Sequence, residues 1–165
     1  MTEKNDAAIG VRLPILFSFR DMLFGNGFVV EVSAQNGRAV CAQEDDAIWM
    51  YGVNPGGMAA SGATAIDARR EFRKAFSGIL QELAREATSF KEFVVLVNEF
   101  FNDTNPGSES DWLEAVQRVR TEHLTAEGLP KVPAESPRKI DIEMREAKQV
   151  TASDNSAAFE PQLAA

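Results

Sequence analysis

Residues 47–68 read AIWMYGVNPGGMAASGATAIDA and contain the patterns of a strand, a turn and a helix in succession. Its first seven residues, Ala47 to Val53, are apolar on both sides of a period-two pattern, which is typical of a strand that is covered on both faces. The Asn-Pro-Gly-Gly run at residues 54–57 is a strong turn signal. Thr64 can then cap a helix, because the residues after it follow a helical period. A strand, a turn and a capped helix in this order predict an α+β fold.

Three further strand patterns precede this stretch. Apolar residues alternate with other types from Leu13 and again from Phe28, and a third pattern runs from Arg38 to Glu44. The turn signals between them are Gly25-Asn26-Gly27, Asn36-Gly37 and Asp45-Asp46. Strands joined by short turns run antiparallel. We therefore expect an antiparallel meander of four strands, with a small fifth strand at residues 58–61.

Three helices are expected after this sheet. From Ala65 an apolar stripe at steps of three and four predicts an amphipathic helix that packs on the sheet. Ser89 and Glu92 have the spacing of a capping box and predict the start of a second helix. A third helix is expected to begin at Ser108 or Ser110.

The chain divides into three parts by composition. Residues 1–10 are polar and are expected to form a flexible leader, and residues 11–125 are expected to form one α+β domain with added helices. Residues 126–165 hold four of the seven prolines and are typical of a disordered tail. One piece of this tail, residues 139–145, alternates apolar and charged side chains and predicts a strand. The last dozen residues are expected to be unstructured.

Composition narrows the class of protein. No apolar run approaches the roughly 20 residues of a membrane helix, and the N-terminus lacks the apolar stretch of a signal peptide, so we expect no membrane association and a cytoplasmic location. The net charge of −8 argues against general binding of nucleic acid, because phosphate contacts need clustered Lys and Arg. Such acidity either keeps the protein in solution or attracts a basic partner.

The residues of common catalytic and metal sites are scarce. His123 is the single histidine and Cys41 the single cysteine, so the usual zinc sites cannot form. Cys41 lies in a strand pattern, where a small buried hydrophobe is expected rather than a nucleophile. The acidic run at residues 44–46 could bind a divalent ion or serve an atypical carboxylate enzyme, but a solvated turn explains it. We therefore expect no catalytic residue, no metal and no cofactor.

Two groups of side chains are candidates for contact with a partner. Trp49, Tyr51 and Val53 share one side of the fourth strand, where the cover could be core packing, the tail strand, a second copy of the chain or a partner protein. Trp and Tyr are frequent anchors of protein interfaces. Arg69, Arg70 and Arg73 form a basic cluster with Lys74. This cluster either contacts phosphate or an acidic protein, or is a solvated helix face.

The segment from about Arg38 to Glu86 resembles the HicB-like antitoxin domain. The shared features, in order, are a strand, an acidic turn, a second strand, a Pro-Gly turn, a short third strand, a Gly-x-Thr step and an amphipathic helix. They correspond here to Ala39 to Gln43, Asp45-Asp46, Ala47 to Val53, Pro55-Gly56, Met58 to Ser61, Gly62-Ala63-Thr64 and the helix from Ala65. An extra hairpin precedes this segment, and two extra helices follow it.

The resemblance implies a function in protein binding. The HicB-like domain has no catalytic role and neutralises an RNA-cleaving toxin by binding it, so the expected partner is a basic toxin of this class. Family members often add a C-terminal helix-turn-helix or ribbon-helix-helix that binds DNA, and residues 139–145 resemble the ribbon of the latter. Only 20 residues follow Arg145, too few and too polar for its two helices, which argues against binding of an operator. The alternative function is a structural homodimer that pairs through Trp49 and Tyr51 and has no toxin partner.

Overall fold

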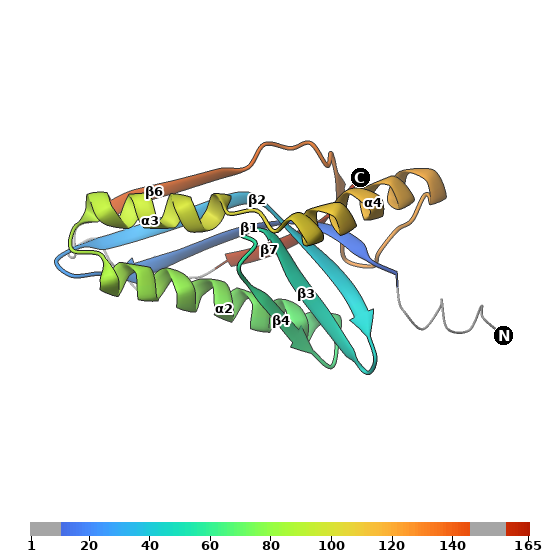
Figure 1. The fold of residues 1–165 in the computed structure, drawn as a ribbon, viewed down its shortest axis with the longest axis horizontal. Helices are drawn as coiled ribbons and strands as arrows, with labels where there is room; N and C mark the ends of the chain where they lie inside the picture. Colours follow the sequence, from blue (N-terminus) through green and yellow to red (C-terminus); the bar gives the residue numbers. More distant parts are fainter. Residues whose placement is uncertain (1–10, 146–157) are drawn as a thin grey trace.

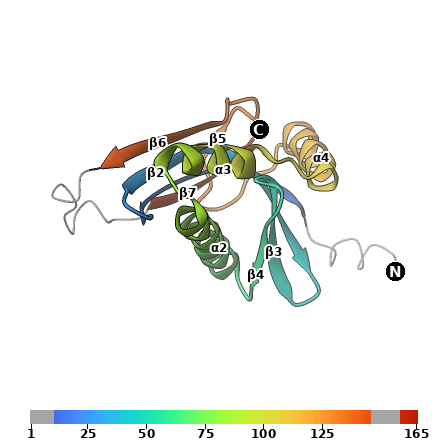
Figure 2. The same ribbon diagram turned by 60° about the vertical axis from the view of Figure 1, so that its left-hand side comes forward.

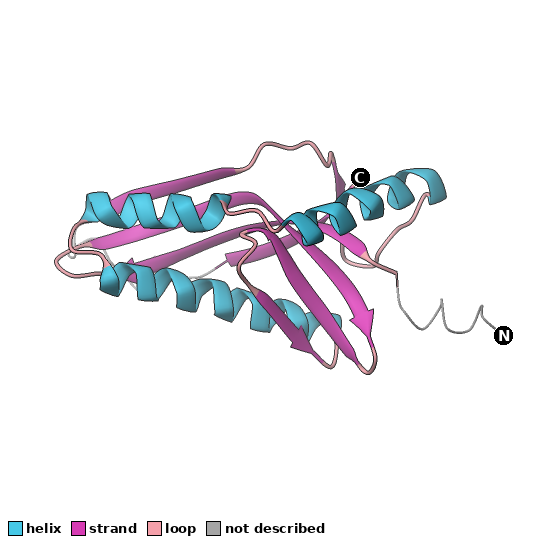
Figure 3. Ribbon diagram, in the orientation of Figure 1, coloured by secondary structure: helices cyan, strands magenta, loops and turns pink. Residues whose placement is uncertain are grey.

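The computed structural model describes residues 11–145 and 158–165, so the expected leader at residues 1–10 lies outside the described part. It shows a mixed, mostly antiparallel sheet of seven strands with three helices, which confirms the α+β class (Figures 1 and 3). The strands are β1 (Leu13–Phe24), β2 (Val29–Glu44), β3 (Ala47–Asn54), β4 (Ala59–Gly62), β5 (Lys131–Val132), β6 (Lys139–Arg145) and β7 (Ala158–Ala164). The helices are α2 (Ala65–Glu86), α3 (Phe90–Asn102) and α4 (Pro106–Glu122).

The first four strands form the expected antiparallel meander, in the order β4-β3-β2-β1. One predicted turn is wrong, however, because β2 runs unbroken through Asn36-Gly37. Asn36 has a φ of 57° and lies where the register between β1 and β2 shifts, so its left-handed backbone makes a bulge in the strand. Gly37 is opposite Phe17, and a Cβ at Gly37 would lie 2.5 Å from the Phe17 ring.

The described parts of the tail belong to the sheet and are not unstructured, whereas residues 146–157 lie outside the described part. The predicted strand at residues 139–145 is confirmed as β6, which pairs with Val29–Gln35 of β2. The last dozen residues contain β7, which pairs with β1 from Ile15 to Arg20 and carries the short parallel strand β5 on its other side. Leu163 and Ala164 of β7 are fully buried. The tail therefore contributes to the core.

Local capping fixes the starts of the helices. The Thr64 side chain accepts a hydrogen bond from the Asp67 amide, and Ser89 does the same for Glu92, as the capping-box spacing predicted. α4 begins earlier than expected, because Asn105 caps it and Pro106 occupies its first turn. None of the three described helices combines the length and apolar character that a membrane crossing requires.

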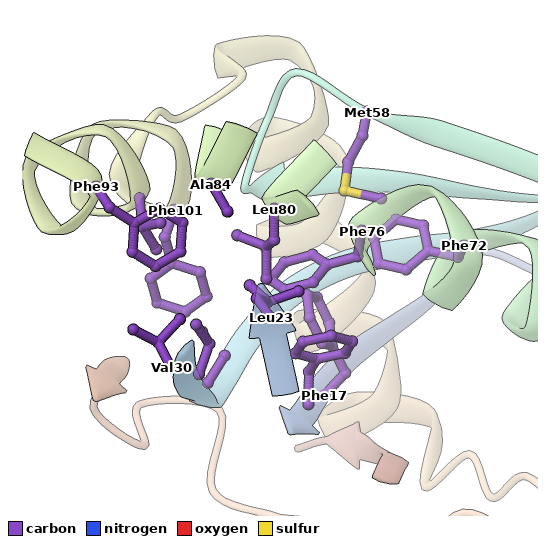
Figure 4. Packing of buried hydrophobic residues seen from close by; sticks show 14 of the residues in the cluster. Phe17, Leu23, Val30, Met58, Phe72, Phe76, Leu80, Ala84, Phe93 and Phe101 are labelled. Atoms are coloured by element: carbon purple, nitrogen blue, oxygen red, sulfur yellow. The ribbon is translucent and has the colours of Figure 1, made fainter. Parts of the chain in front are cut away.

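The buried residues form two clusters, one on each face of the sheet. The larger cluster lies between the sheet and the helices α2 and α3, where the Phe17 ring meets those of Phe72 and Phe76 edge to face (Figure 4). The smaller cluster joins Trp112 and Val116 of α4 to the opposite face of the sheet. The helices therefore cover both faces, but α4 covers only part of the second one.

Candidate functional site

The part of the sheet formed by residues 38–44 of β2 with β3 and β4 will be called the blade. In Figures 1 and 2 the blade extends away from α3 and α4, and the turn between β2 and β3 lies at its far end. The N-terminal half of α2 packs on one face of the blade, against Met50 and Ala60. The opposite face carries the side chains that alternate with these.

Trp49 and Tyr51 lie on this opposite face and stack on each other. Their ring centroids are 5.6 Å apart and their planes differ by 8°. Both side chains are partly exposed, and neither belongs to or packs against the two core clusters of the described residues. Val53, two residues further along β3, is fully buried beneath Trp112 and Val116 of α4. Of the three residues predicted to contact a partner from this strand, Val53 therefore belongs to the core, and Trp49 and Tyr51 lie at the surface.

An acidic rim borders the aromatic pair. The Tyr51 hydroxyl donates a hydrogen bond of 2.6 Å to Oε2 of Glu44, which lies on the neighbouring strand. Burial, this hydrogen bond and the negative charge of Glu44 raise the pKa of Tyr51 from 10 to about 12, while Arg12 acts in the opposite direction. Asp45 and Asp46 form the adjoining turn and are exposed.

Two glycines fix the blade against the helices. A Cβ at Gly56 would lie 2.3 Å from the amide nitrogen of Asn105, so the Pro-Gly turn packs directly on the start of α4. A Cβ at Gly62 would lie 2.5 Å from the amide nitrogen of Ala68, so only glycine lets β4 pass this close to α2. The turn and the Gly-x-Thr step are therefore contacts that set the angle of the blade.

The arginines of α2 do not join the aromatic pair. Arg70 forms an ion pair of 3.1 Å with Asp67 on the solvent side of the helix, as expected for a solvated face. Arg69 is partly buried beside Cys41, on the face of the blade that α2 covers, and Arg73 is partly buried one turn later. The two predicted groups of contact residues thus lie on opposite faces of the sheet.

A buried polar cluster supports the base of the blade. Oδ1 of Asn54, a fully buried residue, accepts hydrogen bonds from Arg38 at 2.5 Å and from Arg138 at 3.1 Å. Its Nδ2 donates to the hydroxyl of Thr104. Arg38 also pairs with Glu109 at 2.6 Å. These residues come from β2, β3, the linker between α3 and α4, α4 and the linker before β6.

This cluster occupies a gap in the sheet. β3 and β6 both pair with the same edge of β2, and the paired ranges leave Asn36 and Gly37 between them. The linker at residues 103–105 passes here, since the Asn105 amide donates to the Val53 carbonyl at 3.0 Å. The gap lets the chain cross from α3 on one face to α4 on the other.

Glu44 and His123, two residues of types that catalytic sites use, lie in different elements of the described structure. Glu44 accepts the Tyr51 hydroxyl, and His123 is an exposed residue with a left-handed backbone that ends α4. Across residues 11–145 and 158–165, no three His, Cys, Asp or Glu side chains are grouped to hold a metal ion. Comparisons with protein-family models, curated proteins and solved structures found no match.

The sequence pattern predicts the aromatic pair but not the polar cluster. The hydrophobic pattern of β3 identified Trp49 and Tyr51, because both lie in one short strand. Asn54 and Arg138 are 84 residues apart in the chain. In the sequence, Asn54 is marked only by its place in the Asn-Pro-Gly-Gly turn. A turn residue is not expected to be buried, so its role in the polar cluster could not be predicted.

Proposed function

We propose that this protein is a non-catalytic binding module whose Trp49–Tyr51 face contacts a basic protein. The observation that carries the proposal is the stacked aromatic pair on a face of the blade that the described helices leave uncovered. Both rings stand on a strand that is paired on each side, and they stack on each other. Because they are already ordered, they lose little conformational entropy on binding. Rings of this kind often dominate the free energy of an interface.

The charge around the pair indicates the kind of partner. Glu44 accepts the Tyr51 hydroxyl, and Asp45 and Asp46 form the exposed turn beside it. The positive charge near Tyr51 is that of Arg12, which is paired with Asp111 at 3.1 Å, and the chain as a whole carries a net charge of −8. The negative charge would attract a basic protein during association, and the acidic side chains could form ion pairs with it at the edge of the contact. A second copy of the chain carries the same acidic turn and the same net charge of −8, so two copies repel each other as they approach. The rim therefore favours a basic protein over self-association.

The element order is consistent with the HicB-like resemblance. Residues 38–86 fold as a strand, an acidic turn, a strand, a Pro-Gly turn, a short strand and a capped helix, in the sequence expected for that domain. In that family such a domain neutralises an RNA-cleaving toxin by binding it. We therefore propose an antitoxin-like role, with a small basic toxin of this class as the partner.

Capture of the partner from an extract of the source organism tests the proposal. The tagged wild-type chain is expected to retain one basic protein in near-stoichiometric amount. The double variant Trp49→Ala/Tyr51→Ala is expected to retain it with an affinity at least about tenfold lower. Val95→Ala is the matched control, because Val95 is an apolar residue on α3 with 50% exposure. The control should bind as the wild type does.

Two further readings separate the alternatives. Capture of a basic partner should weaken as the salt concentration rises, because mobile ions screen the acidic rim. Light scattering of the purified chain should give a monomer for wild type and for Trp49→Ala. A wild-type dimer that Trp49→Ala dissociates would instead support the structural homodimer and contradict the proposal.

A further inference from the structure

The face of the blade that α2 covers contains a small apolar cavity of about 120 Å³. Its floor is a row of three side chains on neighbouring strands, Leu13, Cys41 and Met50, which the strand register places side by side. Arg69 of α2 forms one wall, and the loop at residues 126–129, between α4 and β5, forms the other. An engineered apolar cavity of roughly 150 Å³ binds benzene, so this cavity can hold a branched alkyl group or a small ring.

Arg69 places a positive charge at this cavity. Its charge acts on the Cys41 thiol and opposes the burial that raises the pKa of that thiol. No ion pair joins Arg69 to any residue of the described chain, whereas its neighbour Arg70 pairs with Asp67. Its Nε makes one long hydrogen bond, 3.3 Å, to the Ala65 carbonyl. A guanidinium group beside an apolar cavity matches a ligand with an apolar body and an anionic end.

We infer that this cavity binds a small apolar carboxylate, with the hydrocarbon part over Leu13, Cys41 and Met50 and the carboxylate on Arg69. The site is independent of the proposed protein contact, because the Trp49–Tyr51 pair lies on the other face of the blade. Glu127 lies at the exposed side of the same cavity. An amino group on the ligand would meet this carboxylate, so an apolar amino acid is one source of the same chemistry.

The single cysteine makes occupancy measurable. Cys41 is the only cysteine of the chain and lines the cavity, so a bound ligand should shield it from a thiol reagent. The probe is 4-methylpentanoate, and the readout is the rate of Cys41 alkylation by iodoacetamide, followed by mass spectrometry. We expect a saturable decrease in this rate. Its neutral counterpart, 4-methylpentanamide, should protect roughly tenfold less well, because it lacks the charge that Arg69 recognises.

Matched variants connect the binding to Arg69. Arg69→Gln should weaken protection by 4-methylpentanoate roughly tenfold and leave that by the amide unchanged, while Arg69→Lys should retain part of it. Arg70→Gln, on the solvent side of the same helix, should behave as the wild type. Circular dichroism should show that each variant is folded, and heteronuclear NMR shifts provide a second readout of binding.

Protection by 4-methylpentanoate that depends on Arg69 supports the inference, and leucine as a third probe then identifies the source of the carboxylate. If leucine binds more tightly than 4-methylpentanoate and Glu127→Gln removes the difference, the ligand is an apolar amino acid. If leucine binds more weakly than 4-methylpentanoate, the ligand is a simple carboxylate. Absence of protection at millimolar concentration, or equal protection by acid and amide, would overturn the inference. Trp49→Ala/Tyr51→Ala should leave every result unchanged, so a failure of the protein-binding proposal would be recognised separately.

Discussion

Single side chains connect the acidic rim to the aromatic face. Glu44 accepts the Tyr51 hydroxyl at 2.6 Å, and Tyr51 stacks on Trp49. The hydrogen bond holds the phenol in one orientation, so the ring presents a constant surface. A neutral hydroxyl is needed for this bond, because an ionised phenol would face a carboxylate of the same sign.

The titration of Tyr51 tests this arrangement. Tyr51 is the only tyrosine, so the ultraviolet absorbance of tyrosinate reports on it alone. In the folded protein its pKa should be raised from 10 to about 12, and Glu44→Gln should lower it toward 10. Because the folded-state pKa is the higher one, the stabilisation is complete below pH 10 and is lost as the pH rises toward 12. A pKa near 10 in the wild type that is the same in Glu44→Gln would contradict the hydrogen bond between Tyr51 and Glu44.

The buried amide of Asn54 gives a second prediction at this scale. Asn54→Ala removes the shared acceptor of Arg38 and Arg138 and leaves both guanidinium groups with unmet donors. We expect the free energy of unfolding to fall by about 3 kcal/mol. Asn98→Ala is the control, because that side chain bonds only a carbonyl of its own helix, and a change within about 0.5 kcal/mol is expected there. Urea denaturation measures both, and equal effects would argue against a supporting role for Asn54.

Among the helices and strands, features set by neighbouring residues could be predicted from the sequence, and pairings between distant strands could not. Thr64 and Ser89 were identified as helix caps because capping depends on neighbours a few residues away. Asn36-Gly37 was misread as a reversal, since the same left-handed backbone serves a turn or a bulge, and only the partner strand decides between them. The strand β7 escaped prediction because Pro161 interrupts its pattern and its partner β1 is more than 100 residues away.

The contribution of β7 can be measured. Leu163 is fully buried, so Leu163→Ala should lower the free energy of unfolding by about 3 kcal/mol through lost burial and a residual cavity. Glu160→Ala, an exposed position of the same strand, should change it by less than about 0.5 kcal/mol. If both variants were as stable as the wild type in urea, β7 would not be part of the cooperative core.

In the whole molecule, helices cover the two faces of the sheet to different extents. α2 and α3 pack on one face through the larger hydrophobic cluster, and α4 covers the base of the other. The far end of the second face keeps Trp49 and Tyr51 at the surface beside an acidic turn. The period-two pattern of β3 predicted that its second face is apolar. It could not predict which part of that face α4 covers, because this depends on where the linker between α3 and α4 crosses the sheet, in the gap between β3 and β6.

Site-specific photo-crosslinking in the source organism tests whether the Trp49–Tyr51 face contacts a basic protein. A photoreactive residue replaces Ser61, which is paired with Trp49 across β3 and β4 and leaves the aromatic pair intact. The same residue at Val95 of α3 serves as the control. We expect position 61 to crosslink to one basic protein and position 95 not to do so. Crosslinks from position 61 to a second copy of the chain alone, or the same products from both positions, would contradict it.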